Sequence, residues 1–258
     1  MSLVKFEIKN GVGILTLNRP EKYNSFNTEM AKTLKQHLET CSQDEGIRCV
    51  MLTAEGKAFC AGQDLGEFPD PSSIDFDKIV SENYNPVVKL IREMEKPVVA
   101  AVNGMAAGAG ANLAIACDIV LAKKSAAFVQ AFSKISLIPD SGGTFFLPRL
   151  IGWQRAAALM FTGEKINAED AEKMGMIYRS FEDDVFEKLS FEFCQQLAQM
   201  PTRGIALTKK LLNASSENNL YEQLEKEKTL QVEAGRCEDF KEGVQAFLEK
   251  RPAVFKGK

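Results

Sequence analysis

One carboxylate stands in a sequence setting that suits acid–base chemistry. Asp140 follows Pro139 at the expected start of a helix, and the apolar residues Phe132 and Phe146 are close to it in sequence. An apolar pocket raises the pKa of a carboxyl group by desolvation, which suits a general base. A carboxylate before a helix is also a common N-cap, and the positive helix end lowers its pKa. Asp140 is therefore predicted to be either a base or a cap.

Two glycine-containing corners repeat the same order of features. In each, a short apolar run is followed by Ala-Gly and then by an expected helix; the corners are Ala61-Gly62 and Ala107-Gly108. Backbone N–H groups at such corners can stabilise negative charge on a carbonyl oxygen, as an oxyanion hole does. The glycines could instead serve only a tight turn and close packing. A dinucleotide loop is disfavoured, because the second corner has the spacing G-x-x-x-G-x-G and lacks the later acidic residue.

Two further polar residues are candidates for chemistry. Ser141 lacks the first glycine of a G-x-S-x-G nucleophile elbow, and the single histidine, His37, lies on an expected surface helix. A serine triad is therefore disfavoured. Asn112 is the one strongly polar side chain of an Ala- and Leu-rich helix. It is predicted to be either a buried, hydrogen-bonded amide or a polar contact to a bound acyl group.

The composition excludes several functional classes. The 258 residues include 45% apolar residues, and 32 Lys and Arg face 35 Asp and Glu for a net charge of -3. Such a balance is typical of a globular protein with no field that attracts nucleic acid or an anionic membrane. One histidine disfavours a multi-histidine metal site, and no metal is expected. Six scattered cysteines without C-x-x-C, and an N-terminus unlike a secretory signal, indicate a cytoplasmic protein.

Strands and helices alternate through most of the chain. Apolar alternation over residues 4–8 and 14–17 predicts a β-hairpin, and continuous apolar runs at 49–52, 98–102 and 119–122 predict buried parallel strands. Helices are expected between these strands, and only helices are expected after Pro201. The pattern predicts an α/β core of residues 1–200, which would bind the ligand, and a helical cap or oligomerisation region of residues 201–258.

Together these segments resemble the crotonase superfamily, also called the enoyl-CoA hydratase/isomerase family. The segments that carry the resemblance span nearly the whole chain: Leu17-Asn18-Arg19-Pro20, Gly56 to Leu65, Lys96 to Gly104, Gly108-Ala109-Gly110, Cys117-Asp118-Ile119 and Ile138 to Thr144. The resemblance implies a spiral of ββα units with a helical C-terminal region, assembled as a homotrimer or a dimer of trimers. It also implies acyl-CoA thioester substrates, with coenzyme A present only as part of the substrate and no other cofactor.

The resemblance also implies roles for individual residues. By position, the backbone N–H groups of Gln63 and Ala109 form the oxyanion hole. Residues expected to contact the substrate are Ala61, Gly62, Asp64, Leu65, Gly108, Asn112 and Phe132. Those expected near the CoA phosphates are Arg19, Lys22 and a C-terminal lysine such as Lys250 or Lys256.

The chain departs from the hydratase pattern at three positions. Family hydratases have two glutamates where this chain has Asn112 and Phe132, and they usually have glycine where it has Asp140. Hydration requires one group to activate water and another to protonate carbon. The pattern around Asp140 is similar to that of 2-(1,2-epoxyphenyl)acetyl-CoA isomerases of phenylacetate breakdown and of Δ3,Δ2-enoyl-CoA isomerases.

These departures favour a proton shift over hydration. Asp140 is expected to remove a proton and return it elsewhere, while the N–H groups of Gln63 and Ala109 stabilise the enolate. Three alternatives stay open: hydration of an enoyl-CoA, attack by Asp140 on an aryl-CoA ring as in related dehalogenases, and binding of a CoA ester without catalysis.

Overall fold

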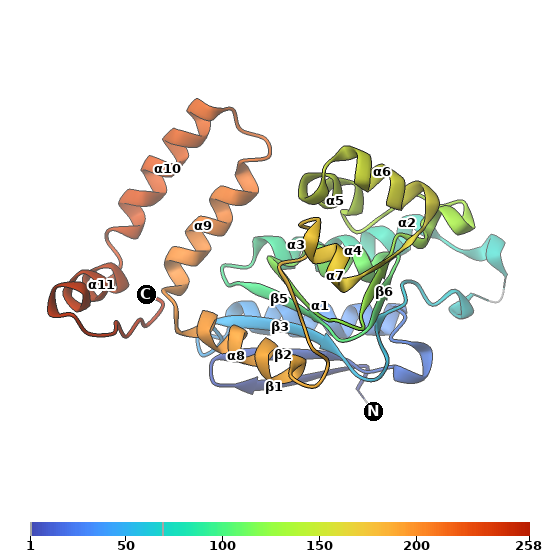
Figure 1. Ribbon diagram of the computed structural model, residues 1–258, viewed down its shortest axis with the longest axis horizontal. Helices are drawn as coiled ribbons and strands as arrows, with labels where there is room; N and C mark the ends of the chain where they lie inside the picture. Colours follow the sequence, from blue (N-terminus) through green and yellow to red (C-terminus); the bar gives the residue numbers. More distant parts are fainter. Residues whose placement is uncertain (1, 69) are drawn as a thin grey trace.

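Two β-sheets, each built mostly from parallel strands, organise the fold (Figure 1). The computed structural model describes residues 2–68 and 70–258. Six strands form the larger sheet in the order β1 (Val4–Lys9), β2 (Val12–Leu17), β3 (Cys49–Ala54), β5 (Val98–Val102), β7 (Ile119–Lys123) and β10 (Arg179–Phe181). Four short strands form the smaller sheet in the order β4 (Ala58–Cys60), β6 (Met105–Ala107), β8 (Ala127–Val129) and β9 (Lys165–Asn167). Only the β1–β2 and β8–β9 pairs are antiparallel among these strands of the described residues.

From β3 to β8, consecutive strands alternate between the two sheets, which produces the spiral. The strands β3, β5 and β7 of the larger sheet are each followed by a strand of the smaller sheet, β4, β6 and β8. The predicted hairpin and the three predicted buried strands are confirmed. The smaller sheet was not predicted, because a strand of three residues is too short to show a periodic pattern.

Helices cover both faces of the larger sheet and fill the space between the sheets. The helices of this part are α1 (Thr28–Gln43), α2 (Phe76–Lys78), α3 (Asn85–Glu93), α4 (Ala109–Ala116), α5 (Gly143–Ile151), α6 (Trp153–Thr162), α7 (Ala168–Lys173) and α8 (Phe186–Gln199). Tighter 3₁₀ turns span Pro20–Lys22, Leu65–Glu67, Pro71–Ser73 and Ala131–Ile135, and a π-helical segment spans Ile79–Tyr84. The N-cap of α1 is Asn27, and its side chain accepts from the Met30 N–H at 2.9 Å.

The central strands of the larger sheet, β3, β5 and β7, are buried on both faces, as their continuous apolar runs predict. In β3, Val50 and Leu52 pack in the main core with α1, α3 and α4, whereas Cys49 and Met51 pack in a second core beneath α8. Successive side chains of a strand point to opposite faces, so a strand covered on both sides is apolar throughout. The two cores therefore pack on opposite faces of the larger sheet.

The chain after Met200 is helical and lies away from the sheets (Figure 1). The helices are α9 (Thr202–Ala214), α10 (Leu220–Ala234) and α11 (Glu238–Glu249), in the part after Pro201 where only helices were expected. No residue of α10 is buried, although it carries several large apolar side chains. None of the helices within residues 2–68 and 70–258 has the length and apolar character that crossing a bilayer requires.

Candidate active site

The two corners that carry the predicted oxyanion donors lie side by side. The strands β4 and β6 pair in parallel, so their carboxyl ends reach the same edge of the smaller sheet. Gly62 follows β4 and Gly108 follows β6. A Cβ atom placed on Gly62 would stand 3.6 Å from the backbone nitrogen of Ala109. The structure therefore brings the two corners that carry the predicted donors, Gln63 and Ala109, close together.

Each corner depends on a glycine with positive φ. The φ angle is +93° at Gly62 and +53° at Gly108, a region that glycine adopts without the strain of a side chain. Ala109 opens α4, so its N–H has no acceptor within the helix. Phe26 donates to Gly62 O and accepts from Asp64 N, which directs the Gln63 N–H away from Phe26. Two backbone donors at one edge are what a carbonyl oxyanion requires.

A cavity of about 260 Å³ opens beside these corners. Its lining includes the predicted residues Ala61, Gly62, Gln63, Leu65, Gly108, Ala109, Phe132 and Asp140. Residues that were not predicted complete the lining: Phe76, Ile79, Tyr84, Ala131, Lys134, Ile135 and Leu137. The wall is mostly apolar, and the polar side chains on it are Gln63, Tyr84, Lys134 and Asp140. This combination suits an acyl chain held next to a small number of proton-handling groups.

Asp140 lies on the wall of this cavity and does not cap a helix. The N-cap of α5 is Gly142, and no side chain accepts from the N-terminal N–H groups of that helix, so the cap interpretation is wrong. The Asp140 Oδ1 atom accepts a 2.9 Å hydrogen bond from Ser141 Oγ. Burial raises the pKa of the Asp140 carboxyl above its ordinary value, and the hydrogen bond from Ser141 opposes that rise. A raised pKa brings a carboxylate closer to what a general base needs.

Asn112 is a buried amide whose two polar atoms are both used by the protein. Its Nδ2 donates to the Asp140 backbone carbonyl at 2.9 Å, and its Oδ1 accepts from Gln130 Nε2 at 2.8 Å. The side chain is fully buried and is not part of the cavity lining. Of the two predicted roles, the structure therefore supports the hydrogen-bonded amide.

The predicted phosphate contacts do not line the cavity, and neither does Asp64, which was predicted to contact the substrate. Arg19 and Asp64 form an ion pair at 2.8 Å, with side chains only 12% and 14% exposed. Arg19 also donates to Ser25 O, so the pair braces the loop that carries Gly62. Lys22 lies exposed in a 3₁₀ turn. Lys250, at the C-cap of α11, and Lys256 are exposed as well.

The serine hydrolase interpretation has no support in the structure. Ser141 is 3% exposed and donates to Asp140, while the His37 ring stacks on Phe6 with centroids 5.1 Å apart. A triad requires the serine hydroxyl to donate to a histidine. Among residues 2–68 and 70–258, no three His, Cys, Asp or Glu side chains gather as a metal site would require.

Tyr84 is the main site residue that the sequence did not reveal. Its hydroxyl donates a 2.6 Å hydrogen bond to Gln63 Oε1, and its ring packs against Phe26 with centroids 5.8 Å apart. Burial raises the pKa of Tyr84 well above its ordinary value, so the hydroxyl keeps its proton and acts as a donor. Tyr84 ends the π-helical segment, in a stretch without clear periodicity, and no sequence signal marks it.

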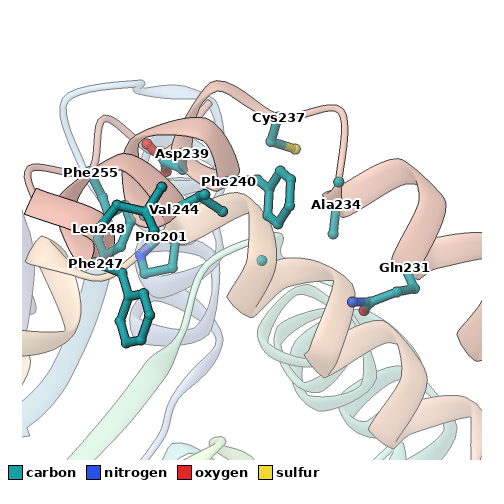
Figure 2. A pocket seen from close by; sticks show the side chains of 13 residues that line it. Pro201, Gln231, Ala234, Cys237, Asp239, Phe240, Val244, Phe247, Leu248 and Phe255 are labelled. Atoms are coloured by element: carbon teal, nitrogen blue, oxygen red, sulfur yellow. The ribbon is translucent and has the colours of Figure 1, made fainter.

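A larger cavity, of about 500 Å³, lies among the C-terminal helices (Figure 2). Its wall is formed mainly by apolar side chains, including Phe240, Phe247 and Phe255. Its carboxylate, Asp239, accepts backbone hydrogen bonds from Lys256 and Gly257 at 2.7 and 2.8 Å. Because Asp239 is occupied in this way and no oxyanion corner is present there, the smaller cavity is the candidate active site.

Comparisons with known proteins agree with this architecture. The sequence model of the family described as enoyl-CoA hydratase/isomerase matches residues 7–258. A 1,2-epoxyphenylacetyl-CoA isomerase of Escherichia coli (strain K12) is 45% identical over 261 residues, covering 100% of both chains. A probable enoyl-CoA hydratase of Rhodobacter capsulatus is 44% identical over 255 residues, covering 99% of this chain and 98% of the relative.

Solved structures agree as well. A putative enoyl-CoA hydratase/isomerase from Mycobacterium abscessus superposes with a TM-score of 0.94 at 35% identity, covering 99% of this chain and 100% of that one. An enoyl-CoA hydratase from Bacillus anthracis superposes with a TM-score of 0.93 at 31% identity, with 99% and 100% coverage. The crotonase fold with a helical C-terminal region is therefore confirmed. The chain belongs to the enoyl-CoA hydratase/isomerase family.

Proposed function

We propose that this protein is an acyl-CoA isomerase that shifts a proton through a thioester enolate, with Asp140 as the base. The observation that carries the proposal is the position of Asp140. Among the described residues that line the cavity, it is the single carboxylate, and the same cavity holds both glycine corners. A base and two backbone donors around one apolar space are the parts that enolate chemistry needs.

The proposed reaction has two proton transfers. The substrate carbonyl oxygen accepts hydrogen bonds from the N–H groups of Gln63 and Ala109, which makes the neighbouring C–H more acidic. Asp140 takes a proton from the α carbon or its vinylogous position, and the electron pair moves onto the thioester oxygen as an enolate. Asp140 then returns the proton to another carbon of the same conjugated system. Each backbone donor is expected to contribute about 10²–10³ in rate. Coenzyme A enters as part of the substrate, and this scheme needs no other cofactor.

Two features support isomerisation over hydration. Hydration requires a group to activate water and a second group to protonate carbon. Asn112 is fully buried outside the cavity lining, and its amide bonds to Gln130 and Asp140, so it is not placed to orient a water molecule in the cavity. Phe132 contributes only an aromatic ring to the cavity. Hydration is nevertheless kept as the second candidate, because a relative at 44% identity is named a probable enoyl-CoA hydratase.

The proposed substrates are 1,2-epoxyphenylacetyl-CoA or a 3-enoyl-CoA. The similarity to the Escherichia coli isomerase supports the first substrate. The apolar side chains of Phe76, Ile79 and Leu137 on the cavity wall suit either an aryl ring or an unsaturated chain. The protein would then act in the cytoplasm, in the breakdown of phenylacetate or of unsaturated fatty acids.

The test measures isomerisation and hydration by the same purified protein. The purified protein is incubated separately with 3-hexenoyl-CoA, 2-hexenoyl-CoA and 1,2-epoxyphenylacetyl-CoA, and products are separated by chromatography with mass detection. Isomerisation gives a product of unchanged mass, whereas hydration adds one water. The proposal expects isomers from the first or third substrate and a much slower hydration of the second. Rapid hydration of 2-hexenoyl-CoA without isomerisation of the other two substrates would contradict the proposal and support a hydratase.

A further inference from the structure

A chain of two buried amides connects the parts of the candidate site. Gln130, directly after β8, donates through Nε2 to Asn112 Oδ1 at 2.8 Å. Asn112, in α4, donates through Nδ2 to the Asp140 backbone carbonyl at 2.9 Å. Gln130 is 2% exposed and Asn112 is fully buried. The two hydrogen-bonded amides therefore link the end of β8, the helix that begins at Ala109, and the turn that carries Asp140.

The direction of these two hydrogen bonds is fixed by the last acceptor, the Asp140 carbonyl. The Asp140 carbonyl can only accept, so Asn112 must present its Nδ2 group to it and its Oδ1 atom to Gln130. Gln130 must then present Nε2, and its Oε1 atom is buried without a hydrogen-bond partner among the described residues. The hydrogen bonds of the two amides therefore run in one direction, from Gln130 through Asn112 to the Asp140 carbonyl.

The geometry ties the base to the oxyanion corner. Asn112 lies one helical turn after Ala109 in α4, so the two residues move as one rigid unit. The start of α5 also packs directly on the amide, because a Cβ atom on Gly143 would stand 2.3 Å from Asn112 Nδ2. Gly143 N also donates to the Asp140 carbonyl, at 2.9 Å. Two donors thus hold the backbone of the residue that carries the base.

We propose that Asn112 and Gln130 are positioning residues, which hold the Asp140 carboxylate at a fixed distance from the oxyanion donor Ala109. This inference rests on the proposed function, since it assigns a role in turnover by Asp140. Neither amide contacts the substrate; each acts through the Asp140 backbone. A misplacement of about 1 Å at a reacting group can cost about 10²-fold in rate, so the expected effect is on kcat.

Two substitutions test the proposal, with a matched control. Asn112→Asp keeps the shape but replaces the donor to the Asp140 carbonyl with an acceptor. Gln130→Met keeps an unbranched side chain and removes the donor to Asn112, so Asn112 Oδ1 loses this hydrogen bond. The control, Asn103→Asp, makes the same chemical change at an amide that donates to Gly56 O at 3.0 Å and does not line the cavity.

The measurements are kcat and KM for isomerisation, and hydrogen–deuterium exchange of the peptide that contains Gly143 N–H. We expect kcat to fall about 10²-fold in Asn112→Asp and about 10-fold in Gln130→Met, with KM within about threefold, in line with a displaced base. Exchange at residues 140–143 should become faster in both variants, and Asn103→Asp should keep kcat and this exchange unchanged. If kcat falls only in proportion to the fraction of unfolded protein in each variant, the positioning role is overturned.

Failure of this inference differs from failure of the proposed function. If Asp140→Asn abolishes isomerisation while Asn112→Asp and Gln130→Met keep the wild-type kcat, only the positioning role is overturned. If Asp140→Asn keeps wild-type turnover, the proposed function fails. Exchange needs no turnover, so unchanged protection of residues 140–143 in Asn112→Asp overturns the positioning role even for a protein without isomerase activity.

Discussion

Lys209 of α9 reaches into the sheet-containing part of the molecule and pairs with Asp118, with 2.7 Å between Nζ and Oδ2. Its Nζ also donates to the backbone carbonyls of Ile91 and Lys96, and Arg92 contacts the second carboxylate oxygen of Asp118 at 3.2 Å. Burial lowers the pKa of Lys209, and the charge of Asp118 opposes that change. This cluster fastens the C-terminal helices to the core.

Removing the carboxylate of this cluster should be strongly destabilising. Asp118→Asn would leave Lys209 buried without its counter-charge, and such a loss typically costs about 3–5 kcal/mol. The comparison is Lys228→Met, which breaks the exposed pair of Lys228 with Glu225 and should cost less than about 1 kcal/mol. Urea unfolding of both variants measures the difference. Equal free energies of unfolding for the two variants would contradict the buried role of Asp118.

The exposed apolar side chains of the C-terminal helices predict self-association. Four large apolar residues on α10 and α11 are more than two-thirds exposed in the single chain: Leu220 at 68%, Tyr221 at 79%, Phe247 at 82% and Leu248 at 73%. Monomeric proteins rarely expose patches of this kind. We expect a trimer or a dimer of trimers, and light scattering at micromolar concentration measures it. A clean species of 28.5 kDa would contradict this expectation.

The glycine corners should be intolerant of a side chain for conformational reasons. Gly108 has φ +53° and ψ −126°, while an added Cβ would be 3.9 Å from the nearest atom, on Phe132. Gly108→Ala therefore creates backbone strain rather than a clash, and the strain should move the Ala109 N–H. We expect kcat to fall by about 10²–10³, the usual effect of losing one oxyanion donor.

The control for this prediction is another glycine with positive φ. Gly152 has φ +80° with no atom within 4 Å of an added Cβ, and it lies between α5 and α6, outside the cavity lining. Gly152→Ala should lower the melting temperature and leave kcat unchanged. Equal losses of kcat in the two variants would mean that the effect at Gly108 is general destabilisation.

The long elements and the corners could be predicted from the sequence because each has a local signal. The apolar runs of β3 and β5 each predict a strand by themselves. The two Ala-Gly corners could be paired because they share one pattern, although the strands β4 and β6 that bring them together are too short to recognise. The division into residues 1–200 and 201–258 stays a prediction.

The wall of the cavity could not be predicted in the same way. Tyr84 and Leu137 reach the cavity through the tertiary arrangement of irregular segments, which have no periodicity. For Asn112, burial could be predicted but the hydrogen-bond partner could not. The partner, Asp140, is 28 residues away in sequence, and only the folded chain reveals the contact. Asp140 itself needed the structure to separate a base from a cap, since both interpretations fit the local sequence.

The pH dependence of turnover should follow the ionisation of Asp140. A base works only when deprotonated, so kcat/KM should fall as the pH decreases through the Asp140 pKa, which burial raises. Ser141→Ala removes the hydrogen bond that opposes this rise. The acidic limb of the profile should therefore move to higher pH in Ser141→Ala. A limb that stays in place or moves to lower pH would contradict the assignment of this limb to Asp140.

The Asp140→Asn variant is expected to fold as well as the wild type. A carboxyl group whose pKa is raised in the folded state destabilises the fold above that pKa, and this effect disappears as the pH falls below its unfolded pKa. Asp140→Asn should therefore be at least as stable as the wild type at pH 7, with a difference that shrinks on acidification.

The decisive measurement is the rate of isomerisation of a bound 3-enoyl- or 1,2-epoxyphenylacetyl-CoA in single turnover, for wild type and Asp140→Asn. Binding of the CoA ester should be retained, because the oxyanion corners and the apolar wall are unchanged. The account predicts that the variant loses at least the ~10²-fold that a general base contributes. A folded Asp140→Asn protein that binds the ester and isomerises it at the wild-type rate would contradict the account.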